Sequence, residues 1–322
     1  MVVWQRCCGF DAIKTMATAA TFAPSWQTKL TGVWGRNIVI AIPMAFLLVV
    51  FLLPFLVVFK ISLSEMDTVF FKDIFSLRDD VIVLTLKFGN YLSLTQDTLY
   101  INAYLSSIKI AAVTTLICLA IAYPFAYFMA RSPADRRPAL LMLVMLPFWT
   151  SFLLRVYAWK MLLADNGPFN NAAIALGLIA EPVKMMNTPF SLVLGMVYTY
   201  VPFMILPLYA NLVKMDLRLL EAALDLGATP WQAFWRITVP LSMSGIIAGS
   251  MLVFIPCVGE FVIPELLGGP ETLMIGHVLW DEFFSNNDWP MAASVAVVMV
   301  ALIIIPLAFF NKHQAESTGG RA

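Results

Sequence analysis

The chain has 322 residues, of which 61% are apolar and 12% are charged, and its formal net charge is zero. A water-soluble domain is about half apolar and about a quarter charged, so this composition excludes an ordinary soluble fold and indicates an integral membrane protein. Four cysteines without a C-x-x-C spacing, and only two histidines (His277 and His313), predict neither a disulfide framework nor a metal cluster.

Six apolar stretches are long enough to cross a membrane. A bilayer core about 30 Å thick needs roughly 20 apolar residues as helix, the only single-segment structure that satisfies its own backbone in lipid. The stretches are residues 38–59, 110–130, 139–163, 189–213, 241–263 and 290–310. We predict an all-α integral membrane protein with six transmembrane helices. Its membrane domain spans residues 38–310 and is flanked by cytoplasmic tails at residues 1–37 and 311–322.

The distribution of charge indicates the orientation. If the N-terminus is cytoplasmic, most Lys and Arg residues fall on the inside, whereas residues 264–289 contain five acidic residues and no Lys or Arg. Basic residues favour the cytoplasmic side, so we predict that both termini are inside. The acidic outer loop either reflects the tolerance of exported loops for acids or forms a funnel that concentrates cations.

The third and fourth stretches carry polar groups that require explanation. Arg155 and Lys160 lie towards the end of the third stretch. In the fourth, Tyr198, Pro202 and Tyr209 share a face, since eleven residues make about three helical turns. Such an aromatic stripe either packs against neighbouring helices or, at Tyr198, lines a cavity.

Residues 214–240 predict two short helices joined by a bend on the cytoplasmic side. The first is indicated by leucines at helical spacing beside a polar stripe, namely Leu217, Leu220 and Leu224 next to Arg218, Glu221 and Asp225. Gly227 can end this helix in a left-handed conformation. Thr229 is a typical N-cap, and Pro230 favours the first position of the second helix.

The charges of this bend favour docking on a protein. A helix that lies on lipid normally carries Lys and Arg on its polar face, and this one carries mixed charge. Asp225 is placed near a helix C-terminus, where the helix dipole disfavours a carboxylate. A cation from another chain would offset that cost. The alternative is an amphipathic helix on the membrane surface.

The fifth stretch contains a carboxylate, Glu260, at membrane depth. Such a group costs about 2.5–3.5 kcal/mol on insertion scales, so it should face a water-filled cavity or a partner. Phe261 lies between Glu260 and Glu265, and carboxylates alternating with an aromatic ring suit a diammonium cation. Pro256 and Pro264 allow this helix to bend.

Two interpretations remain open for this region. Glu260 either lines a pathway or pairs with Arg155 or Lys160 of the third span. Trp280 and Asp281, which follow the turn at Gly268-Gly269-Pro270, either line an outer gate or belong to a surface loop that contacts a substrate-delivering protein.

One cytoplasmic motif resembles a known family. Glu221-Ala222-Ala223, Gly227, Ile237 and Val239-Pro240 resemble the EAA motif of bacterial ABC importer permeases, with Val239 in place of Leu. In that family the loop forms the coupling helix that seats in a cleft of the ATPase subunit. We therefore expect ATPase coupling by Glu221, Ala222, Ala223, Asp225, Gly227 and Pro240.

Residues 148–159, 258–269 and 288–290 resemble the polyamine branch of that family, most of all the permease of putrescine importers. The resemblance runs from about Phe88 to the C-terminus. It implies the type I ABC importer permease fold in the bacterial inner membrane. The implied partners are a second, homologous permease, an ABC ATPase dimer that binds ATP and Mg, and a periplasmic polyamine-binding protein. The candidate pathway residues are Glu260, Phe261, Glu265, Tyr198, Trp280, Asp281 and Arg155.

The sequence contains no G-x-x-x-x-G-K-[ST] phosphate loop, H-E-x-x-H or G-x-S-x-G motif, so we expect neither catalysis nor a cofactor in this chain. Nothing points to nucleic acid. An importer of the same architecture for another amine or amino acid, such as 4-aminobutyrate, is an alternative. An ion-coupled secondary transporter would be favoured by inverted repeats, and we find no convincing repeat.

Overall fold

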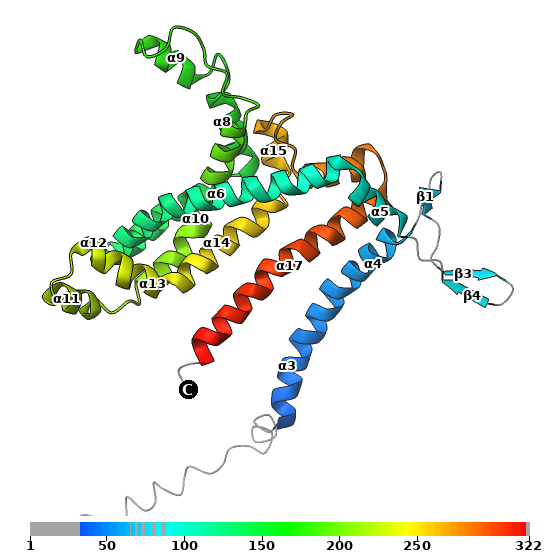
Figure 1. The fold of residues 1–322 in the computed structure, drawn as a ribbon, viewed down its shortest axis with the longest axis horizontal. Helices are drawn as coiled ribbons and strands as arrows, with labels where there is room; N and C mark the ends of the chain where they lie inside the picture. Colours follow the sequence, from blue (N-terminus) through cyan, green and yellow to red (C-terminus); the bar gives the residue numbers. More distant parts are fainter. Residues whose placement is uncertain are drawn as a thin grey trace, which may run out of the picture. The chain divides into compact units, whose positions relative to one another are not determined.

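The computed structural model describes residues 33–64, 66–67, 70–71, 75–78, 81–84 and 88–319 (Figure 1). Most of the predicted N-terminal tail and the last three residues lie outside this range. The elements before the helix bundle are α3 (Val33–Leu47), η1 (Leu48–Leu52), α4 (Leu53–Ser62), β1 (Met66–Asp67), β2 (Phe70–Phe71), β3 (Phe75–Arg78), β4 (Val81–Leu84) and α5 (Gly89–Gln96).

The remaining elements belong to the bundle and its connections. They are α6 (Thr98–Arg131), α7 (Arg137–Met145), η2 (Leu146–Trp149), α8 (Phe152–Leu162), α9 (Pro168–Ala175), α10 (Pro189–Leu212), α11 (Arg218–Asp225), α12 (Pro230–Ala233), η3 (Phe234–Thr238), α13 (Val239–Leu241), α14 (Met243–Val258), α15 (Val262–Leu267), α16 (Ile275–Trp280), η4 (Asp281–Ser285) and α17 (Trp289–Gly319).

The chain divides into two compact units, Met1–Val58 and Phe59–Ala322. In the first, α3, the π-helical turn η1 and the start of α4 continue one another without a break. This helix contains the first predicted span, residues 38–59, and its apolar sequence through Val39–Ser62 is long enough to cross a bilayer.

The core of the second unit is formed by α6, α10 and α14, which pack side by side (Figure 1). On α6, small buried side chains recur every three or four residues, at Ala103, Ser107, Ala111, Thr114, Cys118, Ala122 and Ala126. On α14, a Cβ added to Gly249 would lie 2.8 Å from Met204 Sδ and 3.2 Å from the Met204 carbonyl oxygen of α10. These small residues let the helices approach closely, as is usual in membranes.

Two of the predicted spans correspond to long, continuous helices of this core. α10 (Pro189–Leu212) matches the predicted span at 189–213 and is opened by a Thr188–Ser191 capping box. α6 begins at Thr98, well before the predicted start at residue 110. The reason is Asp97, whose side chain accepts a hydrogen bond from the Leu99 backbone N–H at 2.9 Å and so caps the helix about three turns before the apolar run begins.

The third predicted span, 139–163, is broken. The α7–η2 segment and α8 meet at an angle of 83°. Pro147 lies in the tight 3-10 turn η2, and its carbonyl accepts a hydrogen bond from the Thr150 hydroxyl at 2.8 Å, which closes the turn before α8 begins.

The fifth predicted span, 241–263, is also interrupted. α14 continues through Pro256 to Val258, and residues Gly259–Phe261 are not helical before α15 starts at Val262. Its N-terminal end is bent as well, because the α12–α13 segment and α14 meet at 64°.

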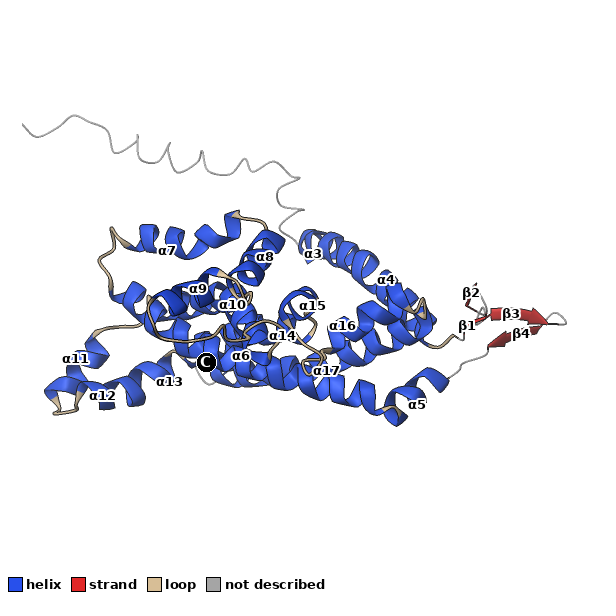
Figure 2. Cartoon of the chain, turned by 90° about the horizontal axis from the view of Figure 1, so that it is seen from above, coloured by secondary structure: helices blue, strands red, loops and turns tan. Residues whose placement is uncertain are grey.

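By length and composition, three helices of the described residues can cross a membrane, or five if each bent pair is one span. α17 covers the sixth predicted span, and its apolar part, Trp289–Ile305, is shorter than the others. The all-α prediction is wrong after α4, where β1 pairs with β2 and β3 with β4 in two antiparallel hairpins (Figure 2). The β-branched run Val81-Ile82-Val83 favours such a strand.

Candidate functional site

Glu260 lies in the break between α14 and α15. Its Oε1 accepts hydrogen bonds from the backbone N–H groups of Val262 and Ile263 at 3.1 and 3.5 Å, and its Oε2 accepts one from the hydroxyl of Tyr200 on α10. The carboxylate thus caps α15, where backbone donors have no helical partner. Gly276 of α16 packs directly against this break, since a Cβ there would lie 2.6 Å from the carbonyl oxygens of both Gly259 and Glu260.

The arginine of the third span does not pair with Glu260. Within the described residues, no ion pair joins Glu260 to Arg155 or Lys160, so the pairing interpretation is not supported. The Arg155 guanidinium instead lies 5.4 Å from the ring centroid of Phe148 and 6.0 Å from that of Phe152. Its Nε and Nη1 are buried without a hydrogen-bond partner.

The structure brings Phe261 and Trp280 together. Their rings stack with centroids 4.6 Å apart and planes 10° apart. Trp280 also contacts Phe284 at 4.1 Å, and the row continues through Phe283 to Trp289. Trp280 is 41% exposed, so this aromatic row presents ring surface rather than burying it.

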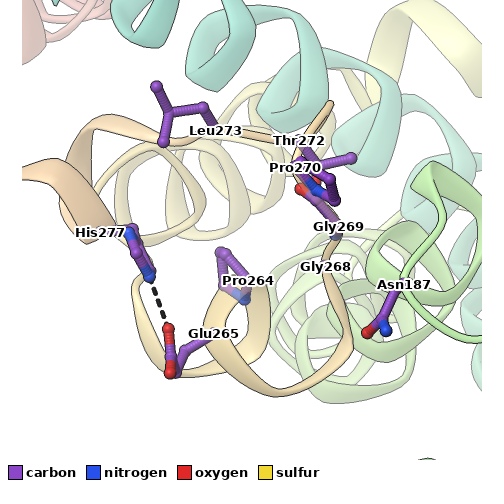
Figure 3. A pocket seen from close by; sticks show the side chains of 9 residues that line it. All are labelled: Asn187, Pro264, Glu265, Gly268, Gly269, Pro270, Thr272, Leu273 and His277. Carbon is purple, nitrogen blue, oxygen red and sulfur yellow. Dashed lines mark hydrogen bonds and ion pairs between the residues drawn. The ribbon is translucent and has the colours of Figure 1, made fainter.

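Glu265 and Asp281 are joined through His277. The Nε2 atom of His277 lies 2.5 Å from Glu265 Oε2, and its Nδ1 lies 3.1 Å from Asp281 Oδ2. Figure 3 shows the Glu265–His277 pair at the wall of a pocket of about 340 Å³. The lining residues are Asn187, Pro264, Glu265, Gly268, Gly269, Pro270, Thr272, Leu273 and His277.

The loop beneath this pocket is held tightly. A Cβ on Gly269 would lie 2.2 Å from the Asn187 carbonyl oxygen, so only glycine permits this approach. Thr272 closes the turn, because its hydroxyl oxygen accepts from the Gly269 N–H at 2.8 Å and its O–H donates to the Gly269 carbonyl at 2.7 Å. The pocket wall is therefore preorganised.

Tyr198 lies in a different place. It lines an apolar cavity of about 390 Å³ between α6, α7, α8 and α10, together with Pro202, and its ring contacts Trp159 at 5.4 Å. The lining of this cavity includes no charged residue, and neither Glu260 nor Glu265 belongs to it. The structure thus does not bring Tyr198 together with the carboxylates.

The predicted bend between two short helices at residues 214–240 forms. α11 ends at Asp225, Gly227 adopts a positive φ of 85°, and Thr229 caps α12 through a capping box with Gln232. Glu221 and Asp225 are exposed, and within the described residues neither carboxylate has an ion-pair or hydrogen-bond partner. The large exposed side chains around the bend are Leu217, Leu219, Leu224, Leu226, Trp231 and Trp235. We call residues 214–240 the elbow.

The sequence does not identify two residues that contact the candidate carboxylates, Tyr200 beside Glu260 and His277 beside Glu265. Tyr200 is separated from Glu260 by sixty positions, and no local pattern connects them. His277 has no functional signal of its own in the sequence, because two histidines are too few to predict a metal cluster. The four-residue spacing of His277 and Asp281, which places them on one helical face, was the available signal.

Comparisons with known proteins agree with one another. The family described as "Binding-protein-dependent transport system inner membrane component" matches residues 16–318. "Spermidine/putrescine transport system permease protein PotB" of Haemophilus influenzae is 38% identical over 280 residues, which are 86% of this chain and 94% of that protein. The protein of the same name in Escherichia coli K12 is 42% identical over 231 residues, 71% of this chain and 84% of that protein.

A solved structure supports the fold. The crystal structure of a bacterial ABC transporter involved in the import of the acidic polysaccharide alginate includes a chain with a TM-score of 0.65 to this one. It is 16% identical, and the match covers 91% of this chain and 99% of that chain. This likeness concerns the fold alone.

Proposed function

Because this chain belongs to the family of binding-protein-dependent transport system inner membrane components, we propose that it is the transmembrane subunit of an ATP-driven importer that carries polyamines into the cytoplasm. The cargo class is putrescine and spermidine. The observation that carries this proposal is that two carboxylates, Glu260 and Glu265, flank Phe261 in the chain and that the Phe261 ring stacks on Trp280. The similarity to spermidine/putrescine permeases over most of the chain supports it.

A polyamine has cationic ends joined by an apolar chain. Carboxylates can pair with its ammonium groups, and aromatic faces can contact both the methylene chain and the cations. Glu260 is only partly buried, and its carboxylate accepts three neutral hydrogen bonds rather than an ion pair. Its negative charge therefore remains available to a passing cation.

The elbow is the proposed contact with the ATPase. Its exposed leucines and tryptophans and its unpaired carboxylates at Glu221 and Asp225 suit burial against another protein. The proposed assembly contains a second, homologous permease, two ATPase copies that bind ATP and Mg, and a periplasmic polyamine-binding protein. The ATPase subunits, rather than this chain, hydrolyse ATP.

The elbow connects mechanically to the cation site. Phe234 of η3 contacts the rings of Tyr123 and Tyr127 on α6 at 5.5 and 6.1 Å. α13 leads through Ser242 into α14, and α14 ends at the break that holds Glu260. A displacement of the elbow by closure of the ATPase dimer therefore reaches Glu260 through a single helix.

Six spans with both termini inside complete the proposal. Ser107 of α6 accepts a hydrogen bond from the Ile275 N–H next to the pocket, and Tyr127 of the same helix contacts the elbow. At about 1.5 Å per residue, the stretch between Ser107 and Tyr127 is about 30 Å long, which equals the hydrocarbon thickness of a bilayer. The pocket and the elbow thus suit opposite membrane faces.

Transport by the assembled complex tests the function. The chain is produced with its three partner proteins in bacteria that lack polyamine uptake, and entry of labelled putrescine and spermidine is measured. We expect uptake that requires the ATPase subunit and falls at least tenfold in Glu260→Gln, because each close ion pair lost in a desolvated site weakens binding by this order. Glu271→Gln is the control, since Glu271 is an exposed carboxylate in the connection between α15 and α16.

Other results would change the assignment. Uptake of 4-aminobutyrate in place of polyamines would keep the importer and change its cargo. Uptake that persists without the ATPase subunit would indicate a secondary transporter. Polyamine uptake that is equal in wild type and Glu260→Gln would show that the carboxylate does not serve the pathway.

A further inference from the structure

His277 stands between two carboxylates, with each ring nitrogen facing one of them. Nε2 is 2.5 Å from Glu265 Oε2 on α15, and Nδ1 is 3.1 Å from Asp281 Oδ2 on η4. A neutral imidazole has one N–H and one lone pair, so it can donate to only one of these oxygens, and its other nitrogen faces an anion. The Nε2 contact with Glu265 is a hydrogen bond, whereas the Nδ1 contact with Asp281 is close enough for an ion pair but lacks hydrogen-bond geometry. An imidazolium in this position is attracted by the charge of both carboxylates, and a neutral ring is not.

Among the described residues, no other basic side chain lies close enough to Glu265 or Asp281 to pair with them in place of His277. α16 packs against α6, α15, α17 and η4. The other acid that η4 brings close, Glu282, already accepts hydrogen bonds from Tyr100 at 2.7 Å and Asn286 at 2.9 Å. Lys109 of α6 is exposed, and the first turns of α17 carry no charged side chain. Among the described residues, His277 is the cation-forming group within 4 Å of Glu265 or Asp281.

The pair also borders an accessible cavity. Glu265 and His277 both line the pocket of about 340 Å³, and the Glu265 side chain is 63% exposed whereas that of His277 is 24% exposed (Figure 3). A cation that enters the pocket thus meets the same carboxylate oxygen that His277 occupies. An imidazolium and a primary ammonium are alternative partners for that oxygen, because both are compact hydrogen-bond-donating cations.

We propose that His277 is a proton-operated plug of the outer cation site, which holds Glu265 and Asp281 when protonated and releases them to a substrate ammonium group when neutral. This inference rests on the proposed polyamine transport and adds its regulation by external pH. Imidazoles change charge between pH 5 and 8. Primary ammonium groups remain charged throughout that range, so the substrate itself does not change. External acid therefore closes the site, and neutral or alkaline pH opens it.

Proteoliposomes separate the outer from the inner pH. The complete transporter is reconstituted with ATP enclosed at a fixed pH, and putrescine uptake is measured with saturating binding protein while the external pH is varied from 8 to 5.5. We expect the maximal uptake rate of wild type to fall severalfold towards the acid end of this range, because imidazoles become charged between pH 8 and 5 and only complexes with neutral His277 accept the substrate.

Substitutions at position 277 give side chains that are permanently neutral or permanently charged. His277→Gln keeps a neutral hydrogen-bonding side chain, and we expect its uptake to change less than about twofold between pH 8 and 5.5. His277→Arg carries a permanent charge, and its rate at pH 8 should resemble that of wild type at pH 5.5. Asp281→Asn, which removes one of the two acids that hold the imidazolium, should flatten the pH profile when each rate is expressed relative to the rate of the same variant at pH 8.

Each result of these uptake measurements supports or contradicts the proposed role of His277. Equal pH profiles of wild type and His277→Gln would overturn the plug, as would a fast His277→Arg variant at pH 8, and both would leave polyamine transport intact. The absence of polyamine uptake by wild type at every pH would overturn the proposed function first. Substrate affinity of the isolated binding protein, measured at the same pH values, shows how much of any common decline arises outside this chain.

Discussion

At the scale of single residues, Glu260 shows how a carboxylate within an apolar stretch is satisfied without an ion pair to any residue that the structure describes. The break after Val258 frees the backbone N–H groups of Val262 and Ile263, and Tyr200 adds a hydroxyl donor from α10. Three neutral donors satisfy the oxygens and leave the net charge uncompensated. A group satisfied in this way is stable yet still attracts a cation, which is what a transport pathway requires.

The Tyr200 hydroxyl is the donor that can be removed without changing shape. Tyr200→Phe leaves the charged oxygen with one partner fewer, and hydrogen bonds to charged groups contribute about 1.5–3 kcal/mol. We expect unfolding of the purified chain in detergent to become easier by about this amount, together with slower polyamine uptake. Tyr209→Phe is the matched control, since Tyr209 is a partly buried residue of the same helix. An equal loss in both variants would contradict a specific role for Tyr200.

Gly276 positions Glu260 through its lack of a side chain. Gly276→Ala would place a methyl group 2.6 Å from the carbonyl oxygens of Gly259 and Glu260, and neither backbone atom can swing aside as a flexible side chain would. Overpacking of this kind costs about 1–3 kcal/mol. We expect a lower thermal midpoint and reduced uptake. Gly89→Ala meets nothing within 4 Å and should keep both properties, so equal effects at the two positions would refute the packing argument.

At the scale of elements, local signals and distant contacts differ in how far sequence predicts them. The elbow was predictable because its determinants, Gly227, Thr229 and Pro230, act on their immediate neighbours. The contact of Tyr200 with Glu260 was not, since it depends on how α10 packs beside the α14–α15 break. Apolar run length located the third and fifth spans and missed their interruptions, because a proline turn such as that at Pro147 leaves hydropathy unchanged.

Gly227 offers a test of the elbow that separates conformation from size. The position has a φ of 85° and open space around it, so an added Cβ meets no atom within 4 Å. Gly227→Ala should be unfavourable by roughly 1–2 kcal/mol from the left-handed backbone alone, whereas Gly227→Asn should be tolerated better because Asn visits this region. We expect ATP hydrolysis coupled to uptake to decline in the order Gly, Asn, Ala.

Two patterns would speak against this account of the elbow. If Gly227→Asn and Gly227→Ala both retain wild-type coupling, the left-handed bend is not required. If both abolish coupling while the complex still assembles, the limit is the size of the residue in the contact with the ATPase, and the conformational argument is wrong.

At the scale of the whole molecule, α6 and α14 connect the elbow with the region around the Glu260 break and the Glu265–His277 pocket. Small residues along α6 and the glycines Gly245 and Gly249 of α14 let these helices pack closely with α10. Such a tight bundle moves as packed helices rather than as separate segments. The elbow at one end and the Glu260 break at the other are therefore coupled by stiff elements, and the side of the membrane on which each lies becomes the decisive question.

Cysteine labelling answers that question. Cys118 and Cys257 are buried and can remain, so only Cys7 and Cys8 need replacement by Ser. Leu226→Cys, at a position 89% exposed on the elbow, and Glu271→Cys, at an exposed position beside the pocket, then report the two ends. With both termini inside, a membrane-impermeant maleimide added to spheroplasts should label Glu271→Cys at once and Leu226→Cys only after permeabilisation. Immediate labelling of Leu226→Cys would place the elbow out of reach of a cytoplasmic ATPase, and the proposed coupling would fail with it.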